Sequence, residues 1–355
     1  AMQRADLVVT TGGIGPTADD LTRHALAAAA DRPLELNAQV WTDIQTLFRR
    51  RGRVMPERNR IQAMFPSASE PIANPNGTAA GIYLALARPD QSQVHVFVLP
   101  GVPAEMREMW FGSLKTRLQQ LLGPQRTIFA HRRIKCFGAG ESELEQMLPG
   151  LTERGRTPMV GITVHRATIT LRVTAQGATM EACQMVMAPT IDVIRECLGT
   201  LIFGEEDDEL QDAVLRLLEC QHSTLATVEI ATQGLVAQWL ATANSASTLY
   251  LGGTVVPSEV WRRANTVDSD ISARVAEMAC QVRGEFHADY GLAIGPVPAS
   301  TDDGSPPRIE FALATPRSVI QESKPFASHP DIRLSLAGKH ALNLIRLSLV
   351  DRSAQ

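Results

Sequence analysis

Two kinds of hydrophobic pattern alternate along the chain and together predict a mixed α/β fold. Residues 7–11 and 94–99 are nearly continuous apolar runs, which are typical of strands buried in a parallel sheet. Residues 37–51 instead carry an apolar side chain at every third or fourth position, and this spacing predicts an amphipathic helix. The strict alternation of apolar and polar residues over 167–174 predicts an antiparallel strand with one buried face.

The order of the predicted elements divides the chain into three domains. Residues 1–124 predict a parallel sheet between two layers of helices, and bulky residues become sparse at the end of this range. Residues 125–204 follow the order strand, helix, hairpin, helix, strand, which indicates a small α+β domain. Residues 205–355 alternate strand and helix and predict a further α/β domain. The acidic run 205–209 at its start is interpreted as a linker and helix start without a metal role.

A glycine-rich loop follows the first strand and leads into a helix. Glycines let the backbone approach a ligand closely, and a helix amino terminus attracts anions, so this loop suits a phosphate or pyrophosphate. Two adjacent carboxylates would repel such a ligand, and a divalent cation held by their oxygens resolves the conflict. The loop residues are Thr11, Gly12, Gly13, Gly15, Pro16 and Thr17, and the carboxylates are Asp19 and Asp20.

The glycine loop matches neither of two common nucleotide-binding motifs, and it has a structural alternative. It lacks the Gly-Lys-Ser/Thr ending of a Walker P-loop and the Gly-x-Gly-x-x-Gly spacing of the dinucleotide fingerprint. A plain turn, with both Asp residues only favouring the start of a helix, is the structural alternative.

The arginine run 49–53 is interpreted as a solvated helix end in preference to an anion-binding patch.

Two further loops are expected to lie beside the glycine loop. Loops at the carboxyl ends of parallel strands meet in one crevice of an open α/β sheet. The second loop, residues 74–81, offers side-chain hydrogen bonds and close backbone approach through Asn76, Gly77 and Thr78. The third follows the strand 94–99 and contains Pro100, Gly101 and Glu105.

The long form of the first motif, Thr-Thr-Gly-Gly-Ile-Gly-Pro-Thr-Ala-Asp-Asp-Leu-Thr, resembles the signature of the molybdopterin-binding superfamily as carried by the competence/damage-inducible CinA proteins. The resemblance extends over all three domains: a molybdopterin-binding-like domain, a KH-like middle domain and a PncC-like carboxyl-terminal domain. CinA proteins carry a further strand and helix before this motif. We therefore expect the first domain to be an amino-truncated copy, with no neighbouring strand on one side of residues 7–11.

The resemblance implies divalent-metal-dependent cleavage of the pyrophosphate in ADP-ribose-like nucleotides. In that reading the loop glycines cradle the phosphates, Asp19 and Asp20 hold the metal, and Asp20 is the catalytic residue. Thr11, Pro16 and Thr17 belong to the same substrate-binding loop. Asn76 and Thr78 contact the nucleotide-type ligand, and the third loop shapes the far wall of the crevice, with Glu105 nearby. A nucleotide- or pterin-binding protein without turnover is the alternative function.

The middle domain does not carry the features of a nucleic-acid-binding KH module. Such a module needs a Gly-x-x-Gly loop in basic surroundings, whereas residues 138–143 here are acidic and differently spaced. We therefore expect a spacer or dimerisation domain, and a homodimer.

The carboxyl-terminal domain resembles a nicotinamide mononucleotide deamidase that has lost its reactive groups. Active relatives have Thr-Ala-Glu-Ser-Cys-Thr-Gly-Gly, and Ile230 stands here at the position of the nucleophilic Ser. Pro257 and Arg262 stand where relatives have the assisting Tyr and Lys. A hydrocarbon cannot attack an amide and arginine stays protonated, so we expect no deamidase activity.

Composition and charge restrict the remaining possibilities. A net charge of −4 argues against a broad nucleic-acid-binding surface, and no apolar run approaches the roughly 20 residues that span a bilayer. The five cysteines are scattered and form no Cys-x-x-Cys pair, which favours reduced thiols in a cytoplasmic protein.

Overall fold

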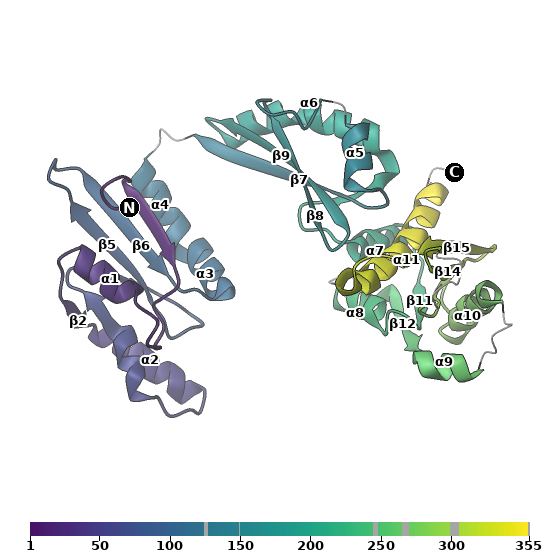
Figure 1. The fold of residues 1–355 in the computed structure, drawn as a ribbon, viewed down its shortest axis with the longest axis horizontal. Helices are drawn as coiled ribbons and strands as arrows, with labels where there is room; N and C mark the ends of the chain where they lie inside the picture. Colours follow the sequence, from purple (N-terminus) through teal and green to yellow (C-terminus); the bar gives the residue numbers. More distant parts are fainter. Residues whose placement is uncertain (124–126, 149, 244–247, 265–269, 299–304, 354–355) are drawn as a thin grey trace. The chain divides into compact units, whose positions relative to one another are not determined.

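The computed structural model describes residues 1–123, 127–148, 150–243, 248–264, 270–298 and 305–353. The chain forms two compact units, Ala1–Arg126 and Thr127–Gln355, which are called unit 1 and unit 2 (Figure 1). Helices and strands are mixed in both, so the multidomain α/β fold expected from the sequence is confirmed.

Unit 1 is built on a four-stranded sheet with the order β1-β6-β5-β4. Its strands are β1 (Leu7–Thr11), β4 (Glu70–Ile72), β5 (Gly81–Ala87) and β6 (Gln93–Leu99). Only β1 and β6 run parallel, so the prediction of a parallel sheet is wrong in this detail. The reason is a tight turn in which Arg88 N donates to Ser92 O at 2.8 Å, because so short a connection joins only antiparallel strands.

Helices cover both faces of this sheet, as the predicted layers require. Alternate residues of one strand point to opposite faces: Ile82 and Leu84 lie in one buried cluster, and Tyr83 lies in the other. The first face packs against α1 (Thr22–Ala29), α2 (Ala38–Arg50) and the 3₁₀ helix η1 (Glu57–Ala63), beside the small pair β2 (Leu34–Leu36) and β3 (Met64–Pro66). The second packs against α3 (Pro103–Met109), the π-helical turn η2 (Trp110–Leu114) and α4 (Lys115–Leu122).

The first half of unit 2 is an antiparallel sheet covered on one face. Its order is β10-β7-β9-β8, and Ile169, Leu171 and Val173 are buried as their alternation predicts. The strands are β7 (Ile128–Cys136), β8 (Met159–His165), β9 (Thr168–Gly177) and β10 (Ile202–Glu205), and the covering helices are α5 (Glu141–Met147) and α6 (Met180–Leu198).

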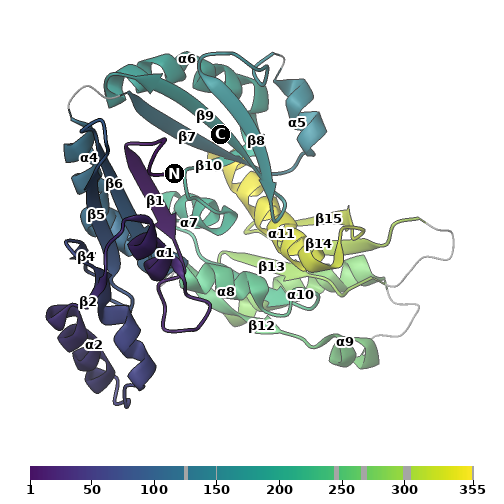
Figure 2. The same cartoon turned by 60° about the vertical axis from the view of Figure 1, so that its left-hand side comes forward.

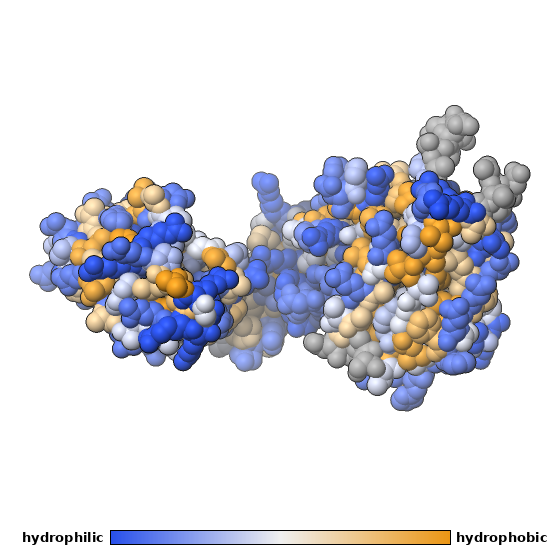
Figure 3. Space-filling model, turned by 90° about the horizontal axis from the view of Figure 1, so that it is seen from below, coloured by the Kyte–Doolittle hydropathy of each residue, from blue (hydrophilic) through white to orange (hydrophobic). Residues whose placement is uncertain are grey.

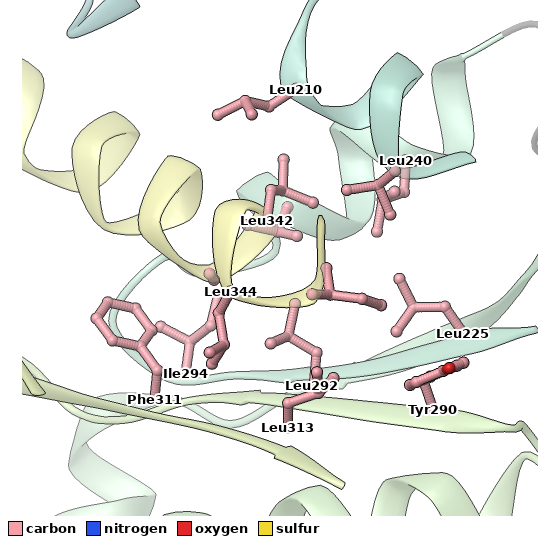
Figure 4. Close-up of a cluster of buried hydrophobic side chains, with 14 of the residues drawn as sticks. Leu210, Leu225, Leu240, Tyr290, Leu292, Ile294, Phe311, Leu313, Leu342 and Leu344 are labelled. Carbon is pink, nitrogen blue, oxygen red and sulfur yellow. The ribbon is translucent and has the colours of Figure 1, made fainter. Parts of the chain in front are cut away.

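The second half of unit 2 is a five-stranded sheet with the order β12-β11-β13-β14-β15. Its strands are β11 (Leu225–Glu229), β12 (Tyr250–Val255), β13 (Tyr290–Ile294), β14 (Arg308–Ala314) and β15 (Val319–Pro325). Leucines and aromatic residues pack one face against α7 (Leu210–Cys220), α8 (Leu235–Thr242) and α11 (Pro330–Ser353), as Figure 4 shows. Sequence analysis missed β15, an edge strand that is rich in polar residues and half exposed.

The other face of this sheet carries small side chains and is covered by α10 (Ile271–Glu285), while α9 (Ser258–Ala264) lies between β12 and α10 in the chain. Ala226, Ala293 and Ala312 are buried there, which lets α10 approach the sheet closely. The approach is closest at Gly291, where an added Cβ would lie 2.1 Å from the carbonyl oxygen of Ala279.

The acidic run 205–209 is paired with basic side chains. Glu205 contacts Arg132 and Arg195, while Asp208 pairs with Arg216 at 2.7 Å. Glu209 lies 3.6 Å from Lys339, a buried lysine of α11 that also donates to Thr168 of β9. The run therefore joins the two sheets of unit 2.

We predict that Gly291→Ala destabilises unit 2 by about 1–3 kcal/mol, because the new methyl group overlaps α10 and forces it away from β13. The matched control is Gly161→Ala in β8, where an added Cβ meets no atom within 4 Å. Urea denaturation of both variants measures the effect. Equal unfolding midpoints would contradict the proposed close packing.

Candidate functional site

Three loops converge at one edge of the unit 1 sheet. β1 and β6 are parallel, with Thr11 opposite Leu99, so the loops that follow both strands leave the sheet together. β5 is antiparallel to β6, with Ile82 opposite Val98, so the loop that precedes β5 reaches the same edge (Figures 1 and 2). The expected convergence is present, although the second loop arrives at the amino end of a strand.

Direct contacts join the third loop to each of the others. Gly12 N donates to the carbonyl oxygen of Leu99 at 2.9 Å, and a Cβ on Gly101 would lie 3.2 Å from Gly12 Cα. On the other side, Asn74 Nδ2 donates to Glu105 Oε2 at 2.7 Å. The structure therefore brings the predicted residues Gly12, Gly101 and Glu105 to one edge.

The glycine loop folds back onto the residues that follow it. A Cβ on Gly13 would lie 2.1 Å from Thr22 Oγ1, and a Cβ on Gly15 would lie 2.5 Å from Asp20 Oδ2. Gly13 also has a φ of +70°, which side-chain-bearing residues rarely adopt. These glycines are thus required by the packing of Asp20 and Thr22 against the loop.

The carboxylate of Asp20 is held in a defined position by Thr17. Asp20 Oδ2 accepts from Thr17 N at 2.9 Å and from Thr17 Oγ1 at 2.5 Å. The hydroxyl of Thr17 holds the pKa of Asp20 below its ordinary value, and Arg23 adds to the effect. Asp20 is therefore ionised at neutral pH.

Asp19 and Asp20 lie before helix α1, and not in its first turn as predicted. The helix begins at Thr22 with Leu21 as its N-cap residue, and its first turn contains no acidic residue. The turn from Thr17 to Asp20 closes first, with Asp20 N donating to Thr17 O at 3.1 Å. Asp20 still lies directly before the N-cap residue, so this turn suits the structural alternative, a plain turn at the start of a helix, as well as a ligand site.

Asn74 organises the second loop, and sequence analysis did not single it out. Its Oδ1 accepts from Gly77 N at 2.9 Å, while its Nδ2 donates to Ala79 O at 3.0 Å as well as to Glu105. A Cβ on Gly77 would lie 2.1 Å from Glu105 Oε2, so a larger residue there would displace the glutamate carboxylate. The Asn-Pro-Asn-Gly sequence is a turn signal that could have pointed to this role.

The remaining predicted residues surround these contacts. Asn76 turns its amide towards Glu108 Oε2, at 2.5 Å, and its carbonyl oxygen accepts from Arg51 Nη2 at 2.6 Å. Asn76 is therefore occupied by protein partners. The other predicted positions differ in exposure: Thr11 and Thr17 are exposed, Pro16 and Thr78 are half-buried, and Pro100 is buried.

A buried arginine lies beneath the glycine loop, and the sequence did not reveal it. Arg23 is 0% exposed, and its Nη2 donates to Ile14 O at 3.1 Å. Its Nε and Nη1 have no hydrogen-bond partner among the described residues. Burial lowers the pKa of Arg23 to about 10, and the charge of Asp20 opposes this shift. The guanidinium remains charged at neutral pH, so the loop rests on a buried positive charge.

The carboxylates here form at most part of a metal site. Within the described ranges, no group of three or more His, Cys, Asp or Glu side chains is placed to hold a metal ion. Magnesium sites commonly use one or two carboxylates and take their other ligands from water and substrate phosphates. Asp19 and Asp20 fit that pattern, since Asp19 is exposed and Asp20 is only half-buried.

In the last domain, the segment that resembles the deamidase motif is held in place by a buried glutamate. Glu229 is 0% exposed and accepts from Thr232 Oγ1 at 2.5 Å and from Ala237 N at 2.7 Å, which fills the amino end of α8. The adjacent Ile230 is also fully buried. Pro257 is exposed, and the exposed Arg262 pairs with Glu259 at 2.7 Å.

Family models match successive parts of this chain. The probable molybdopterin binding domain matches residues 1–120, the damage-inducible protein CinA KH domain residues 131–204, and the CinA C-terminal domain residues 207–349. A CinA-like protein of Synechococcus sp. is 33% identical over 98% of this chain and 86% of its own length. The chain belongs to the CinA family.

Other CinA proteins resemble it to a similar degree. A CinA-like protein of Thermomicrobium roseum is 32% identical over 100% of this chain and 85% of its own. A crystal structure of the protein CinA with unknown function, from Thermoplasma acidophilum, is 33% identical over 33% of this chain and 65% of its own, with a TM-score of 0.28. Among the described helices, none is both long and apolar enough to cross a membrane.

We predict that Arg23→Met leaves the free energy of unfolding of unit 1 within about 1 kcal/mol of wild type, or raises it. A buried charge with unmet donors contributes little net stability, and Asp20 keeps its bonds to Thr17 in the variant. Urea denaturation followed by circular dichroism gives the value. A loss above about 3 kcal/mol would show that the guanidinium has a strong partner.

Proposed function

We propose that unit 1 binds the pyrophosphate of an ADP-ribose-type nucleotide and hydrolyses it with the help of a divalent cation. The observation that carries this proposal is the position of Asp20: an ionised carboxylate held by Thr17 against the glycine loop, at the edge where three loops meet. The family assignment is consistent with a ligand of this class but specifies no reaction.

One backbone N–H group of the glycine loop supports phosphate binding. Gly12 N is already bonded to Leu99 O, so it is not available to a ligand, and Ile14 is buried. Gly13 is half-buried, and in the described part of the chain its N–H donates to no protein atom. The buried charge of Arg23 lies beneath the loop and adds an attraction that salt screens weakly.

The chain's own groups have three tasks in the proposed reaction. Gly13 N binds a phosphate oxygen, Asp19 and Asp20 would hold the cation, and the contacts between Asn74 and Glu105 keep the opposite wall in place. The cation, when bound, would neutralise charge on the pyrophosphate oxygens during cleavage. No lysine follows the loop to supply this charge.

A binding protein without turnover is the second candidate. Binding alone needs the contacts of the glycine loop with the phosphates but no cation for cleavage. Calorimetry with ADP-ribose, beside an assay for AMP, separates the two, because a binding protein gives heat without product.

We predict that Asp20→Asn abolishes AMP production from ADP-ribose while the fold is kept, because the amide retains the shape of the carboxylate but not its charge. The matched control is Asp90→Asn, since Asp90 Oδ1 accepts from Ser92 N at 3.0 Å and Ser92 Oγ at 2.6 Å in a similar turn between β5 and β6. Chromatographic detection of AMP, with magnesium or manganese present, measures both variants.

Two results would contradict the metal-centred reaction. One is hydrolysis by Asp20→Asn at the wild-type rate, and the other is wild-type hydrolysis that continues in an excess of chelator. Loss of activity in Asp90→Asn as well would show that the effect of Asp20→Asn is not specific to the site.

For the last domain we propose the absence of nicotinamide mononucleotide deamidase activity. The full chain should release no ammonia from this substrate, and Ile230→Ser alone should not restore release, because Pro257 and Arg262 supply neither the phenol nor the amine of the active relatives. A coupled ammonia assay tests both proteins. Release above background from the wild-type chain would refute this proposal.

A further inference from the structure

A hollow of about 440 Å³ lies between α2 and the segment 71–80, next to the loops of the candidate site. This volume is within the range of small-molecule pockets. The hollow shares Asn74, Gly77 and Thr78 with the second loop. A ligand whose phosphates lie on the glycine loop could therefore extend into it.

The walls of the hollow differ in chemistry. Gln39, Asp43, Thr46 and Arg50 line it at the spacing of one helix face, and this polar wall belongs to α2. Val40, Ile44 and Leu47 add apolar surface, and Pro71 and Pro75 line the opposite side. The α2 wall thus offers hydrogen bonds and charge together with apolar surface, while the side with the two prolines suits a flat apolar group.

The arginines at the end of α2 have separate tasks. Arg51 donates to Asn76 O at 2.6 Å, which fixes the helix end to the second loop. Arg49 turns back to Gln45 O and Thr46 Oγ1, at 3.4 and 3.3 Å. The Arg50 side chain lines the hollow and makes no hydrogen bond or ion pair with any described residue. Arg50 is exposed in the last turn of α2, as expected for a solvated helix end, whereas Arg51 is tied to the second loop.

We propose that this hollow binds the nucleoside part of the nucleotide, with Arg50 as the residue that selects it. This inference rests on the proposed function of the adjacent glycine loop. The base packs between the prolines and Leu47, and the Arg50 guanidinium donates to the nitrogen and oxygen acceptors of the nucleoside. Asp43 accepts from Gln39 Nε2 at 2.9 Å and keeps further lone pairs, which suit the hydroxyl groups of a ribose.

Binding of ADP-ribose and of inorganic pyrophosphate, both measured by calorimetry with magnesium present, tests the proposal. Arg50→Gln should raise the dissociation constant for ADP-ribose about tenfold or more and leave that for pyrophosphate unchanged, because pyrophosphate has no nucleoside. Asp43→Asn should weaken ADP-ribose binding in the same selective way. The matched control is Arg49→Gln, which removes the same charge one residue away and should leave both constants unchanged. Circular dichroism checks that each variant is folded.

The other outcomes are each decisive. Equal weakening of both ligands by Arg50→Gln would place Arg50 on the phosphates and overturn the proposal, as would an equal effect of Arg49→Gln. Unchanged ADP-ribose binding in both Arg50→Gln and Asp43→Asn would overturn it while the proposed function stands. If wild type binds pyrophosphate but not ADP-ribose, the hollow takes no nucleoside. If wild type binds neither ligand, the proposed function fails together with this inference.

Discussion

The contact between the Asp20 carboxylate and Gly15 sets the geometry of the whole candidate site. Asp20 can occupy this place only because residue 15 has no Cβ, and Thr17 then bonds to the carboxylate from its backbone and its hydroxyl. The same fold-back brings Thr22 against Gly13 and starts α1 directly beneath the loop. One close approach thus fixes the glycine loop, the ionised carboxylate and the helix behind them.

The second wall of the site depends on a similar constraint. Gly77 admits the carboxylate of Glu105, and Asn74 ties that carboxylate to its own loop. Arg23, in contrast, is buried at a cost in solvation that its single bond to Ile14 does not offset. A preorganised polar site is commonly less stable than an apolar core would be, and it gains its function from groups that are already in position before the ligand binds. On the face that Figure 3 shows, hydrophilic residues are interspersed with hydrophobic ones.

Much of this could be predicted from the sequence because it is encoded locally. The strand 7–11, its glycine loop and the hairpin around residues 159–175 follow from residue type and periodicity over a few positions. The direction of β5 was missed although Pro89 and Asp90 mark a short turn at 88–92, and so short a connection implies an antiparallel pair. Arg23 and Asn74 were missed for another reason: their roles arise from contacts between segments, and no local pattern distinguishes a buried arginine on α1 from an exposed one.

The central claim is that a cation bridges the Asp19–Asp20 pair and the phosphates of the nucleotide, so that neither is bound tightly without the other. Electron paramagnetic resonance of manganese, titrated with the protein in the absence and presence of ADP-ribose, tests this most directly. We expect weak manganese binding by the protein alone, because the described residues supply no more than an incomplete ligand set, and a clear increase in affinity when ADP-ribose is added. The same manganese affinity with and without ADP-ribose would contradict the account.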